Sequence, residues 1–491
     1  MTIDSEPAEK VPTGISGLDP IALGGLPRGS STLVTGTTGT GKTLFAIEFL
    51  ARGVADYSQP GVYVTFEEKA EDIRRNARRF GFPIDEWERE GLWAFVDGSD
   101  HLATETVTSG TYNYAALVSR VSSAIRRISA ARVSLDSIGA ILARYPDVAT
   151  VRGELLRFVS SLKELDVTSV LTAERREEHD GVSLLGTEEY VVDNVIVLRN
   201  LLHAERRRRT IEIVKFRGAR HRTGEWLFTI DPGEGLVIIP LAFLAPREEA
   251  SAVRVSTGTP DLDQMCEGGV FKDAVILLTG PTGAGKTLTG LMFARAAYAS
   301  GERCLFYTYD EPRDRLVRSA AGWGLDLTTM EESGLLRVVS VYPEAASLED
   351  HFLSLRRNVE EFSPNRLVID TLSALERIVT PRGLLDFVIA LGAVLREREI
   401  TTLLTSAPSG RFTSTITPAI ALESTSLADV GINIRYVEHA GNIQRAIAIL
   451  QTRGSGHDSA VRQVTMEAGQ GMRIGDPLPH TAHLLPNEGG M

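Results

Sequence analysis

The stretch Gly36-Thr37-Thr38-Gly39-Thr40-Gly41-Lys42-Thr43 decides the fold of the first half of the chain. It matches the pattern G-x-x-x-x-G-K-[ST] between a β-branched run, Thr32–Thr35, and an amphipathic stretch, Leu44–Arg52. A strand, this loop and a helix in that order form the phosphate-binding loop, or P-loop, of nucleotide-binding proteins. A second copy, Gly280-Pro281-Thr282-Gly283-Ala284-Gly285-Lys286-Thr287, follows the apolar run Val275–Thr279. Two copies in one context argue against a chance glycine-rich turn.

Each residue type of the loop has a role in binding phosphate. Glycines let backbone N–H groups turn toward the phosphates, and the N-terminus of the following helix adds positive potential. The lysine reaches the β- and γ-phosphate oxygens, and the last hydroxyl ligates Mg²⁺. We therefore expect ATP and Mg²⁺ at Gly39, Thr40, Gly41, Lys42, Thr43 and Leu44 in the first half, and at Thr282, Gly283, Ala284, Gly285, Lys286, Thr287 and Leu288 in the second.

The chain also repeats itself. Val11-Pro12-Thr13-Gly14 followed by Leu18-Asp19 returns as Val255-Ser256-Thr257-Gly258 followed by Leu262-Asp263, at an offset of 244. The loop lysines share this offset, since 286 − 42 = 244, and two acidic landmarks follow at 310 − 67 = 243 and 370 − 136 = 234. Landmarks in one order at nearly one offset indicate duplicated domains.

Length and periodicity lead to the fold class. A chain of 491 residues exceeds a single core, which stops growing at roughly 250–300 residues. Each half alternates short β-branched runs with amphipathic segments, as a parallel sheet with crossover helices does. We predict an α/β fold of two tandem RecA-like P-loop NTPase domains, each a mostly parallel twisted sheet flanked by helices. The domains are placed at residues 1–246 and 247–491, with a charged, proline-containing linker around Pro240–Arg254.

Acidic residues follow predicted strands in both halves. Asp136 and Asp370 each end an apolar strand, where a carboxylate can hold Mg²⁺ through water; these are the Walker B positions. A helix cap is the lesser interpretation. Glu67-Glu68 and Asp310-Glu311 come directly after other strands, at the carboxyl edge where ligands collect. One acid of each pair is the candidate general base, against the alternative of a solvated acidic turn.

A basic motif comes late in each half. Arg217 of Lys215-Phe216-Arg217-Gly218 and Arg453 of Gln451-Thr452-Arg453-Gly454 lie 217 − 136 = 81 and 453 − 370 = 83 residues after the Walker aspartates. In a ring, a cation here could reach a neighbouring subunit's γ-phosphate as an arginine finger. The tract Arg206–Arg209 favours an ion-paired strand over a nucleic-acid site, because the net charge of the chain is −12.

Composition bounds the class of protein. With 43% hydrophobic and 24% charged residues, the chain is typical of a soluble globular protein. It has no signal-peptide pattern and no apolar run near the roughly 20 residues that a bilayer needs. We expect a cytoplasmic protein with neither a membrane nor a nucleic-acid partner. Cys266 and Cys304 are expected to be buried free thiols.

These motifs resemble the circadian clock protein KaiC family. The resemblance runs from about Val11 to Ile474 and is most specific in VYVTFEE at Val62–Glu68, in Asp193–Gly218, in RVSTG at Arg254–Gly258 and in IDTLSAL at Ile369–Leu375. It implies a homohexameric double ring with nucleotides between subunits. It also implies a slow ATPase in the first domain and a serine/threonine autokinase, with or without autophosphatase activity, in the second. The implied role is in a circadian clock or in timing and stress signalling.

The resemblance also assigns residues. Glu67 and Glu68 are implied as the acids of the first site, with Lys215, Arg217 and His221 entering from a neighbour. Further implied nucleotide contacts are Phe216 and Asp231 in the first domain and Trp323, Arg377, Arg445, Arg453, Ser455 and His457 in the second, beside Asp310 and Glu311. Asp310 joins the Mg²⁺ ligands Thr43, Asp136, Thr287 and Asp370.

The family's phosphorylated Ser-Thr pair, counted back from Tyr436, falls on Thr425-Ser426 in reversed order. A shift of one residue to Ser424-Thr425 restores the order, so all three hydroxyls are candidates. By residue type alone, the run is a capping or loop segment.

Three departures limit what the resemblance implies. Asp310 is one methylene shorter than the family's glutamate, and a misplacement of about 1 Å can cost on the order of 10²-fold in rate, so a slow kinase is expected. Gln451 replaces a lysine and removes a cation from the subunit interface. The tail after Ile474 lacks amphipathic periodicity, so control by KaiA is not expected, whereas a KaiB-like partner of the first domain stays open.

Two other functions remain as alternatives. A RecA-like ATPase ring without kinase activity would use its second domain as a nucleotide sensor. A recombinase or helicase would share the core and the ring but needs a basic channel, which a net charge of −12 disfavours.

Overall fold

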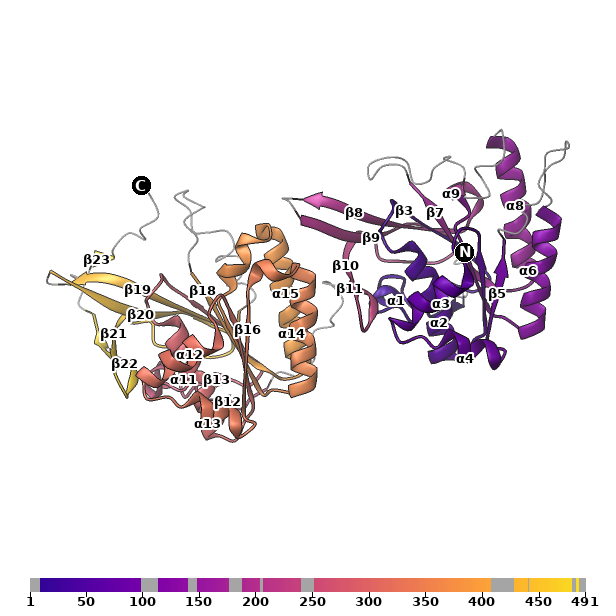
Figure 1. The fold of residues 1–491 in the computed structure, drawn as a ribbon. Helices are drawn as coiled ribbons and strands as arrows, with labels where there is room; N and C mark the ends of the chain where they lie inside the picture. Colours follow the sequence, from indigo (N-terminus) through magenta and orange to yellow (C-terminus); the bar gives the residue numbers. More distant parts are fainter. Residues whose placement is uncertain are drawn as a thin grey trace. The chain divides into compact units, whose positions relative to one another are not determined.

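The computed structural model describes residues 9–98, 114–139, 148–175, 188–203, 206–239, 251–407, 428–439, 441–478 and 483–484. The chain divides into two compact units, Met1–Pro240 and Leu241–Met491, whose elements are labelled in Figure 1. The predicted boundary between residues 246 and 247 lies outside the described residues.

The first unit is built on a nine-stranded sheet with the order β11, β10, β9, β8, β3, β7, β6, β4, β5. Strands from β8 to β5 pair in parallel, and those from β8 to β11 pair antiparallel. The strands are β3 (Ser31–Gly36), β4 (Gly61–Thr65), β5 (Trp93–Asp97), β6 (Arg132–Asp136), β7 (Thr168–Glu174), β8 (Asn194–His203), β9 (Arg206–Phe216), β10 (Glu225–Asp231) and β11 (Gly235–Ile239). A separate pair is formed by β1 (Lys10–Val11) and β2 (Leu26–Pro27).

Helices cover both faces of this sheet (Figure 1). On one face lies α2 (Lys42–Tyr57), where Ser134 of β6 donates to the backbone oxygen of Ala46 at 2.9 Å. On the opposite face α6 (Tyr114–Ile128) and α8 (Val148–Glu164) pack against Val133 and Leu135, the neighbours of Ser134 in β6. The alternation follows from the two-residue repeat of a strand. The other helices are α1 (Leu18–Ile21), α3 (Ala70–Arg78), α4 (Ile84–Arg89) and α9 (Glu188–Val191).

The second unit repeats this sheet in the order β16, β15, β17, β18, β14, β19, β20, β21, β22, with β23 paired to β19. The strands are β14 (Val275–Thr279), β15 (Cys304–Tyr309), β16 (Leu336–Val341), β17 (Arg366–Asp370), β18 (Thr401–Ser406), β19 (Val430–His439), β20 (Asn442–Thr452), β21 (Arg462–Glu467), β22 (Gly471–Pro477) and β23 (His483–Leu484), with β12 (Arg254–Val255) and β13 (Val270–Phe271) paired apart. The helices are α10 (Pro260–Met265), α11 (Lys286–Ala299), α12 (Arg313–Gly322), α13 (Leu327–Glu332), α14 (Leu348–Phe362), α15 (Pro381–Glu397) and the 3₁₀ turns η1 (Pro343–Ala345) and η2 (Leu372–Arg377).

The two sheets have the same connectivity strand by strand. Starting from β5 in the first unit and from β16 in the second, each step along the sheet reaches the corresponding strand, so β3 matches β14 and β6 matches β17. The predicted fold class, two tandem RecA-like domains with mostly parallel sheets, is confirmed.

The repeated Thr-Gly and Leu-Asp landmark stabilises a turn. Asp19 accepts hydrogen bonds from the backbone N–H and the hydroxyl of Thr13, at 2.8 and 2.7 Å, and Asp263 accepts the same pair from Thr257, both at 2.6 Å. Gly258 has a φ of +88°, and a Cβ there would lie 2.0 Å from the carbonyl oxygen of Met292, so only glycine fits. The landmark therefore fixes the turn near the start of each domain.

The two cysteines, the arginine tract and the lack of a membrane-spanning pattern were also considered in the sequence. Cys266 and Cys304 are buried and free, as expected. The arginine tract opens strand β9, where Arg207 donates to the carbonyl oxygen of Asn200 at 2.8 Å. Within the described residues, no helix is both long enough and apolar enough to cross a membrane.

Each domain buries one arginine at the start of its Walker B strand, Arg132 in β6 and Arg366 in β17. Both donate to a backbone carbonyl of the segment that opens their domain, at 2.7 and 2.6 Å. Glu302 neutralises Arg366, with Nε to Oε2 at 2.6 Å, whereas Arg132 has the neutral Gln59 at the same place, with Nε to Oε1 at 2.7 Å. Burial lowers the pKa of Arg132 to about 10.

We predict that Gln59→Glu stabilises the first domain by about 1 kcal/mol, because a half-buried carboxylate would compensate a buried charge at little desolvation cost. The measurement is the free energy of unfolding from denaturant titration. Glu302→Gln is the matched reverse change and should destabilise the second domain. A Gln59→Glu protein that unfolds at lower denaturant than the unmodified chain would contradict the argument.

Candidate functional site

The two P-loops adopt the same backbone conformation. Gly39 and Gly41 have φ values of +81° and +100°, and Gly283 and Gly285 have +77° and +111°, a region that glycine enters without strain. Each helix then begins at the loop lysine, with α2 at Lys42 and α11 at Lys286. Free N–H groups at the start of a helix are therefore directed toward the loop.

Both lysines bend across their own loop. Nζ of Lys42 donates to the carbonyl oxygen of Thr37 at 2.9 Å, and Nζ of Lys286 donates to those of Gly280 and Pro281 at 2.7 and 3.0 Å. Burial lowers the pKa of Lys286, although the nearby Asp370 opposes the shift. Each ammonium is held where it could meet a phosphate at the loop.

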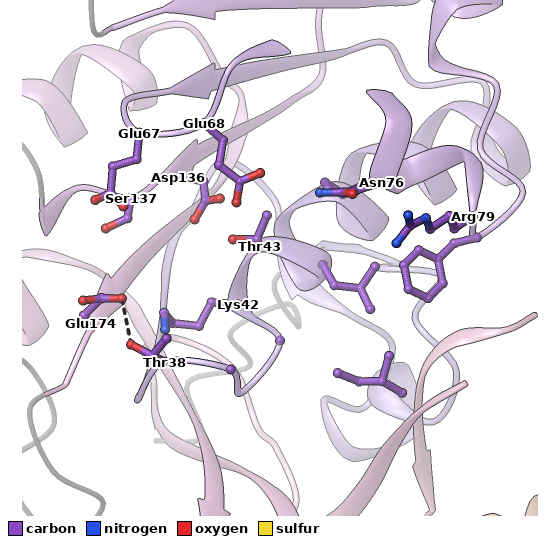
Figure 2. Close-up of a pocket in the computed structure, with 16 residues that line it drawn as sticks. Thr38, Lys42, Thr43, Glu67, Glu68, Asn76, Arg79, Asp136, Ser137 and Glu174 are labelled. Carbon is purple, nitrogen blue, oxygen red and sulfur yellow. Dashed lines mark hydrogen bonds between the residues drawn. The ribbon is translucent and has the colours of Figure 1, made fainter. Parts of the chain in front are cut away.

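A cavity of about 600 Å³ opens over the first P-loop. Figure 2 shows Glu67, Glu68 and Asp136 gathered above Thr43, with Lys42 below them. Its lining also includes residues that the sequence did not single out: Ile47, Asn76, Arg79, Phe80, Ser137, Glu174 and Ile230. Glu174 could have been predicted from the sequence, because it is an acidic residue at the end of β7, the strand next to the one that precedes the P-loop.

The Walker aspartates lie where the sequence placed them, at the ends of β6 and β17. Oδ1 of Asp136 accepts a hydrogen bond from Thr172, and Oδ1 of Asp370 accepts one from the equivalent Thr405. The hydrogen-bond donor to Oδ2 of the Walker aspartate differs between the domains. Tyr63 donates to Asp136 at 2.8 Å, whereas Thr287 of the P-loop donates to Asp370 at 2.6 Å.

Glu67 and Glu68 follow β4 and lie beside Asp136 in the lining of the cavity (Figure 2). Partial burial raises the pKa of both carboxyls. The negative charges of Glu174 and Asp136 raise the pKa of Glu67 further, and those of Asp136 and Asp72 raise that of Glu68. A carboxylate with a raised pKa accepts a proton more readily, as a general base should.

The second acidic pair has a different environment. Asp310, with φ of +74°, is bound by both terminal nitrogens of Arg377, and Nη1 lies 2.6 Å from Oδ2. Arg377 also donates from Nε to Glu344 at 2.7 Å, and the two acids raise its pKa. Burial and the charge of Asp370 raise the pKa of Glu311. The structure thus pairs Arg377 with Asp310, whereas Glu311 lies within electrostatic range of the Walker aspartate Asp370.

Lys215 and Gln451, which occupy equivalent positions in the late motifs of the two domains, make similar contacts with the backbone despite their different charge. Nζ of Lys215 donates to the carbonyl oxygens of Glu189 and Val192, both at 2.7 Å, and Nε2 of Gln451 donates to that of Ala428 at 2.9 Å. Both side chains therefore bind backbone carbonyls just before the equivalent strands β8 and β19. Burial, followed by the charge of Arg217, lowers the pKa of Lys215. Arg217 and Arg453 are exposed.

The remaining predicted contacts are distributed around the two sheets. His221 packs edge-on against the buried Phe216 at 5.4 Å, and Oδ1 of Asp231 accepts the N–H groups of the β10–β11 turn. Nε of Arg445 donates to the carbonyl oxygen of Gly283 in its own P-loop at 3.3 Å. Trp323, Ser455 and His457 are half-buried, and Trp323 packs on the core of the second unit. Ser424, Thr425 and Ser426 lie outside the described residues.

Comparisons with known proteins agree with this geometry. The family model for the KaiC ATPase matches residues 11–242 and 255–478. The circadian clock protein KaiC3 of Synechocystis is 44% identical over 483 residues, covering 98% of this chain and 95% of that protein. The circadian clock oscillator protein KaiC of Thermostichus vulcanus is 42% identical over 476 residues, covering 96% and 90%, and that of Synechococcus elongatus is 44% identical over 454 residues, covering 92% and 87%.

Two RecA-like domains, each with a P-loop beside a Walker aspartate, define a tandem P-loop ATPase. With matches over both domains and nearly the full length, the chain belongs to the KaiC family. The resemblance inferred from the motifs is confirmed.

The helix after the first P-loop carries a fully buried acid, Glu48. Its Oε1 accepts the backbone N–H of Leu236 in β11 at 2.6 Å, and burial raises its pKa from 4.5 to about 8. In the second domain Met292 stands at the same offset, since 292 − 48 = 244, and its sulfur accepts the N–H of Met472 in β22 at 3.2 Å. The same contact is thus made by a titratable group in the first domain only.

We predict that Glu48 makes the first domain less stable as pH rises. Between its ordinary pKa of 4.5 and its folded pKa of about 8, the folded state binds more protons than the unfolded state. The free energy of unfolding therefore falls as pH rises through this window, by up to about 1.4 kcal/mol per pH unit, and changes little above it.

Glu48→Gln keeps the acceptor for Leu236 and cannot ionise, so it should stabilise the first domain at pH 8 and remove this part of its pH dependence. Calorimetric unfolding at pH 6, 7 and 8 provides the measurement. Glu48→Met, which copies the second domain, is the matched control. The same pH slope in Glu48→Gln and the unmodified chain would show that Glu48 does not titrate in this range.

Proposed function

We propose that this protein is a KaiC-like, Mg-ATP-dependent ATPase that forms a homohexamer and acts in circadian timing or in a related stress-signalling clock. The observation that carries the proposal is the convergence of Lys42, Thr43, Asp136, Glu67 and Glu68 on one cavity over the first P-loop. The relatives' names as circadian clock proteins support the role in timing.

The residues at this cavity fit a magnesium nucleotide. The left-handed glycines turn backbone N–H groups inward, and Thr43 and Asp136 supply the oxygen ligands that Mg²⁺ prefers. When bound, Mg²⁺ would neutralise negative charge on the phosphates. The ammonium of Lys42 would release the carbonyl oxygen of Thr37 and donate to a phosphate oxygen instead. Glu67 or Glu68, with a raised pKa, would accept the proton of the attacking water.

The exposed cations suggest how hydrolysis would be coupled to assembly. Arg217 and Arg453 are exposed at the ends of β9 and β20, and such a side chain is useful to a phosphate only if another subunit brings one within reach. We propose that Arg217, with Lys215 and His221, contributes to the first site of a neighbouring subunit. A KaiB-like protein remains a candidate partner of the first domain.

We predict that ATP drives assembly chiefly through the first domain. Lys42→Ala should weaken the ATP-dependent hexamer more than Lys286→Ala, because the first site has two glutamates, whereas Arg377 engages an acid of the second. Sedimentation with and without Mg·ATP measures the oligomer. The two variants control for each other, and equal loss of assembly in both would contradict the prediction.

In the second domain we propose serine/threonine autokinase activity toward Ser424, Thr425 or Ser426, with Asp310 as the base. Lys286 donates to a carbonyl of its own loop as Lys42 does in the first domain, and Thr287 donates to the Walker aspartate Asp370. The family to which the chain belongs supports the proposal. The bidentate contact of Arg377 with Asp310 favours a second candidate function, in which this domain senses nucleotide without transferring phosphate.

We predict that phosphotransfer is slow and depends on Asp310. Asp310→Glu should speed it, because the longer side chain extends the carboxylate, and Asp310→Asn should reduce it by about tenfold or more while ATP still binds. Lys286→Ala should remove both binding and transfer. Peptide mass spectrometry after long incubation with Mg·ATP provides the measurement. If even Asp310→Glu carries no phosphate on residues 424–426, the second domain is a sensor.

A further inference from the structure

The Walker aspartates of the two domains differ in the hydroxyl that holds Oδ2. In the second domain it is the hydroxyl of Thr287, the last residue of the P-loop, at 2.6 Å. In the first domain it is the phenol of Tyr63, at 2.8 Å, while Thr172 occupies Oδ1. Both oxygens of Asp136 are therefore bound by side chains that lie outside the P-loop.

The difference follows from one substitution at equivalent positions. Tyr63 pairs with Ser134 in the register of β4 and β6, and Phe306 pairs with Val368 in that of β15 and β17. Asp136 comes two residues after Ser134 in β6, and Asp370 comes two residues after Val368 in β17. Each aspartate therefore lies on the same face of its sheet as the residue that pairs with Tyr63 or Phe306. Because Phe306 has no hydroxyl, it leaves Oδ2 of Asp370 to Thr287.

Packing fixes the Tyr63 hydroxyl. The ring is fully buried, lies 6.2 Å from the ring of Trp93 at an interplanar angle of 15°, and lies 5.8 Å from the ring of Phe95. The hydroxyl of this buried ring donates to Oδ2 of Asp136 at 2.8 Å. Because packing holds the ring, its hydroxyl is kept within hydrogen-bond distance of Oδ2.

We propose that Tyr63 is a positioning residue that weakens the binding of Mg²⁺ at the first nucleotide site by engaging Oδ2 of Asp136. This inference rests on the proposed function of that site. Oδ2 of Asp136 already accepts a hydrogen bond from Tyr63, so it has less capacity left to accept one from a metal-bound water. Thr172 still holds Oδ1 when Tyr63 is replaced by phenylalanine, so the variant keeps one of the two hydrogen bonds that Asp136 accepts from side chains outside the P-loop.

The test compares Tyr63→Phe with the parent protein in a full-length Lys286→Ala chain, which restricts nucleotide binding to the first site. A fluorescent ADP analogue is the probe, and its binding is followed as Mg²⁺ is titrated, so the readout does not depend on hydrolysis. Tyr63→Phe should lower the half-saturating Mg²⁺ concentration by about 3- to 10-fold, the size expected when one competing hydrogen bond is removed.

Ser134→Ala is the matched control. It removes a buried hydroxyl that donates to the carbonyl oxygen of Ala46 at 2.9 Å, on the same face of the sheet. It should leave the Mg²⁺ requirement unchanged. Thermal unfolding of both variants verifies that the first domain is folded.

The outcomes separate the two claims. An unchanged Mg²⁺ requirement in a folded Tyr63→Phe protein would show that Tyr63 only packs, and a higher requirement would show that it aids metal binding; either result overturns the inference and leaves the proposed function intact. If the Lys286→Ala parent binds the analogue without any dependence on Mg²⁺, both the inference and the proposed magnesium site fail.

Discussion

The left-handed turn that carries each chain from strand to P-loop helix is the constraint on which both domains depend. Positive φ at Gly39 and Gly41 directs the first N–H groups of α2 back toward the carboxyl edge of the sheet. Because the neighbouring strands run parallel to β3, they end at the same edge and bring Glu67, Asp136 and Glu174 together. The cavity is acidic for a topological reason, and burial followed by the charges of Glu174 and Asp136 raises the pKa of Glu67.

The features predicted correctly from the sequence are local or repeated. A P-loop is a run of eight residues in a strand–loop–helix context, and duplication made its interpretation secure. Side-chain partners were not predictable, because they depend on register and on packing between distant residues. Tyr63 meets Asp136 across 136 − 63 = 73 residues, and Glu48 meets Leu236 across 236 − 48 = 188. Neither distance leaves a periodic signal in the sequence.

Two expectations about single residues need a structural account. Gln451 was expected to remove a cation from a subunit interface, yet it donates to a carbonyl just before β19, as Lys215 does just before the equivalent β8, so the substitution preserves a backbone contact. Asp310 was expected to act through its shorter reach. Its pairing with Arg377, across 377 − 310 = 67 residues, is a second restraint on the same carboxylate. The sequence showed the shorter side chain but not its partner.

Duplication has left the framework of the two domains alike and changed the side chains that surround it. The turn held by Asp19 or Asp263, the P-loop and the Walker aspartate recur with the same contacts to the backbone or to a threonine. Around α2 and α11, however, Glu48 is matched by Met292 and Tyr63 by Phe306. In both pairs the polar group belongs to the first domain. Because phosphate and Mg²⁺ respond to charge and to hydrogen bonding, equal loops in unequal surroundings are sufficient for two sites of different affinity in one chain.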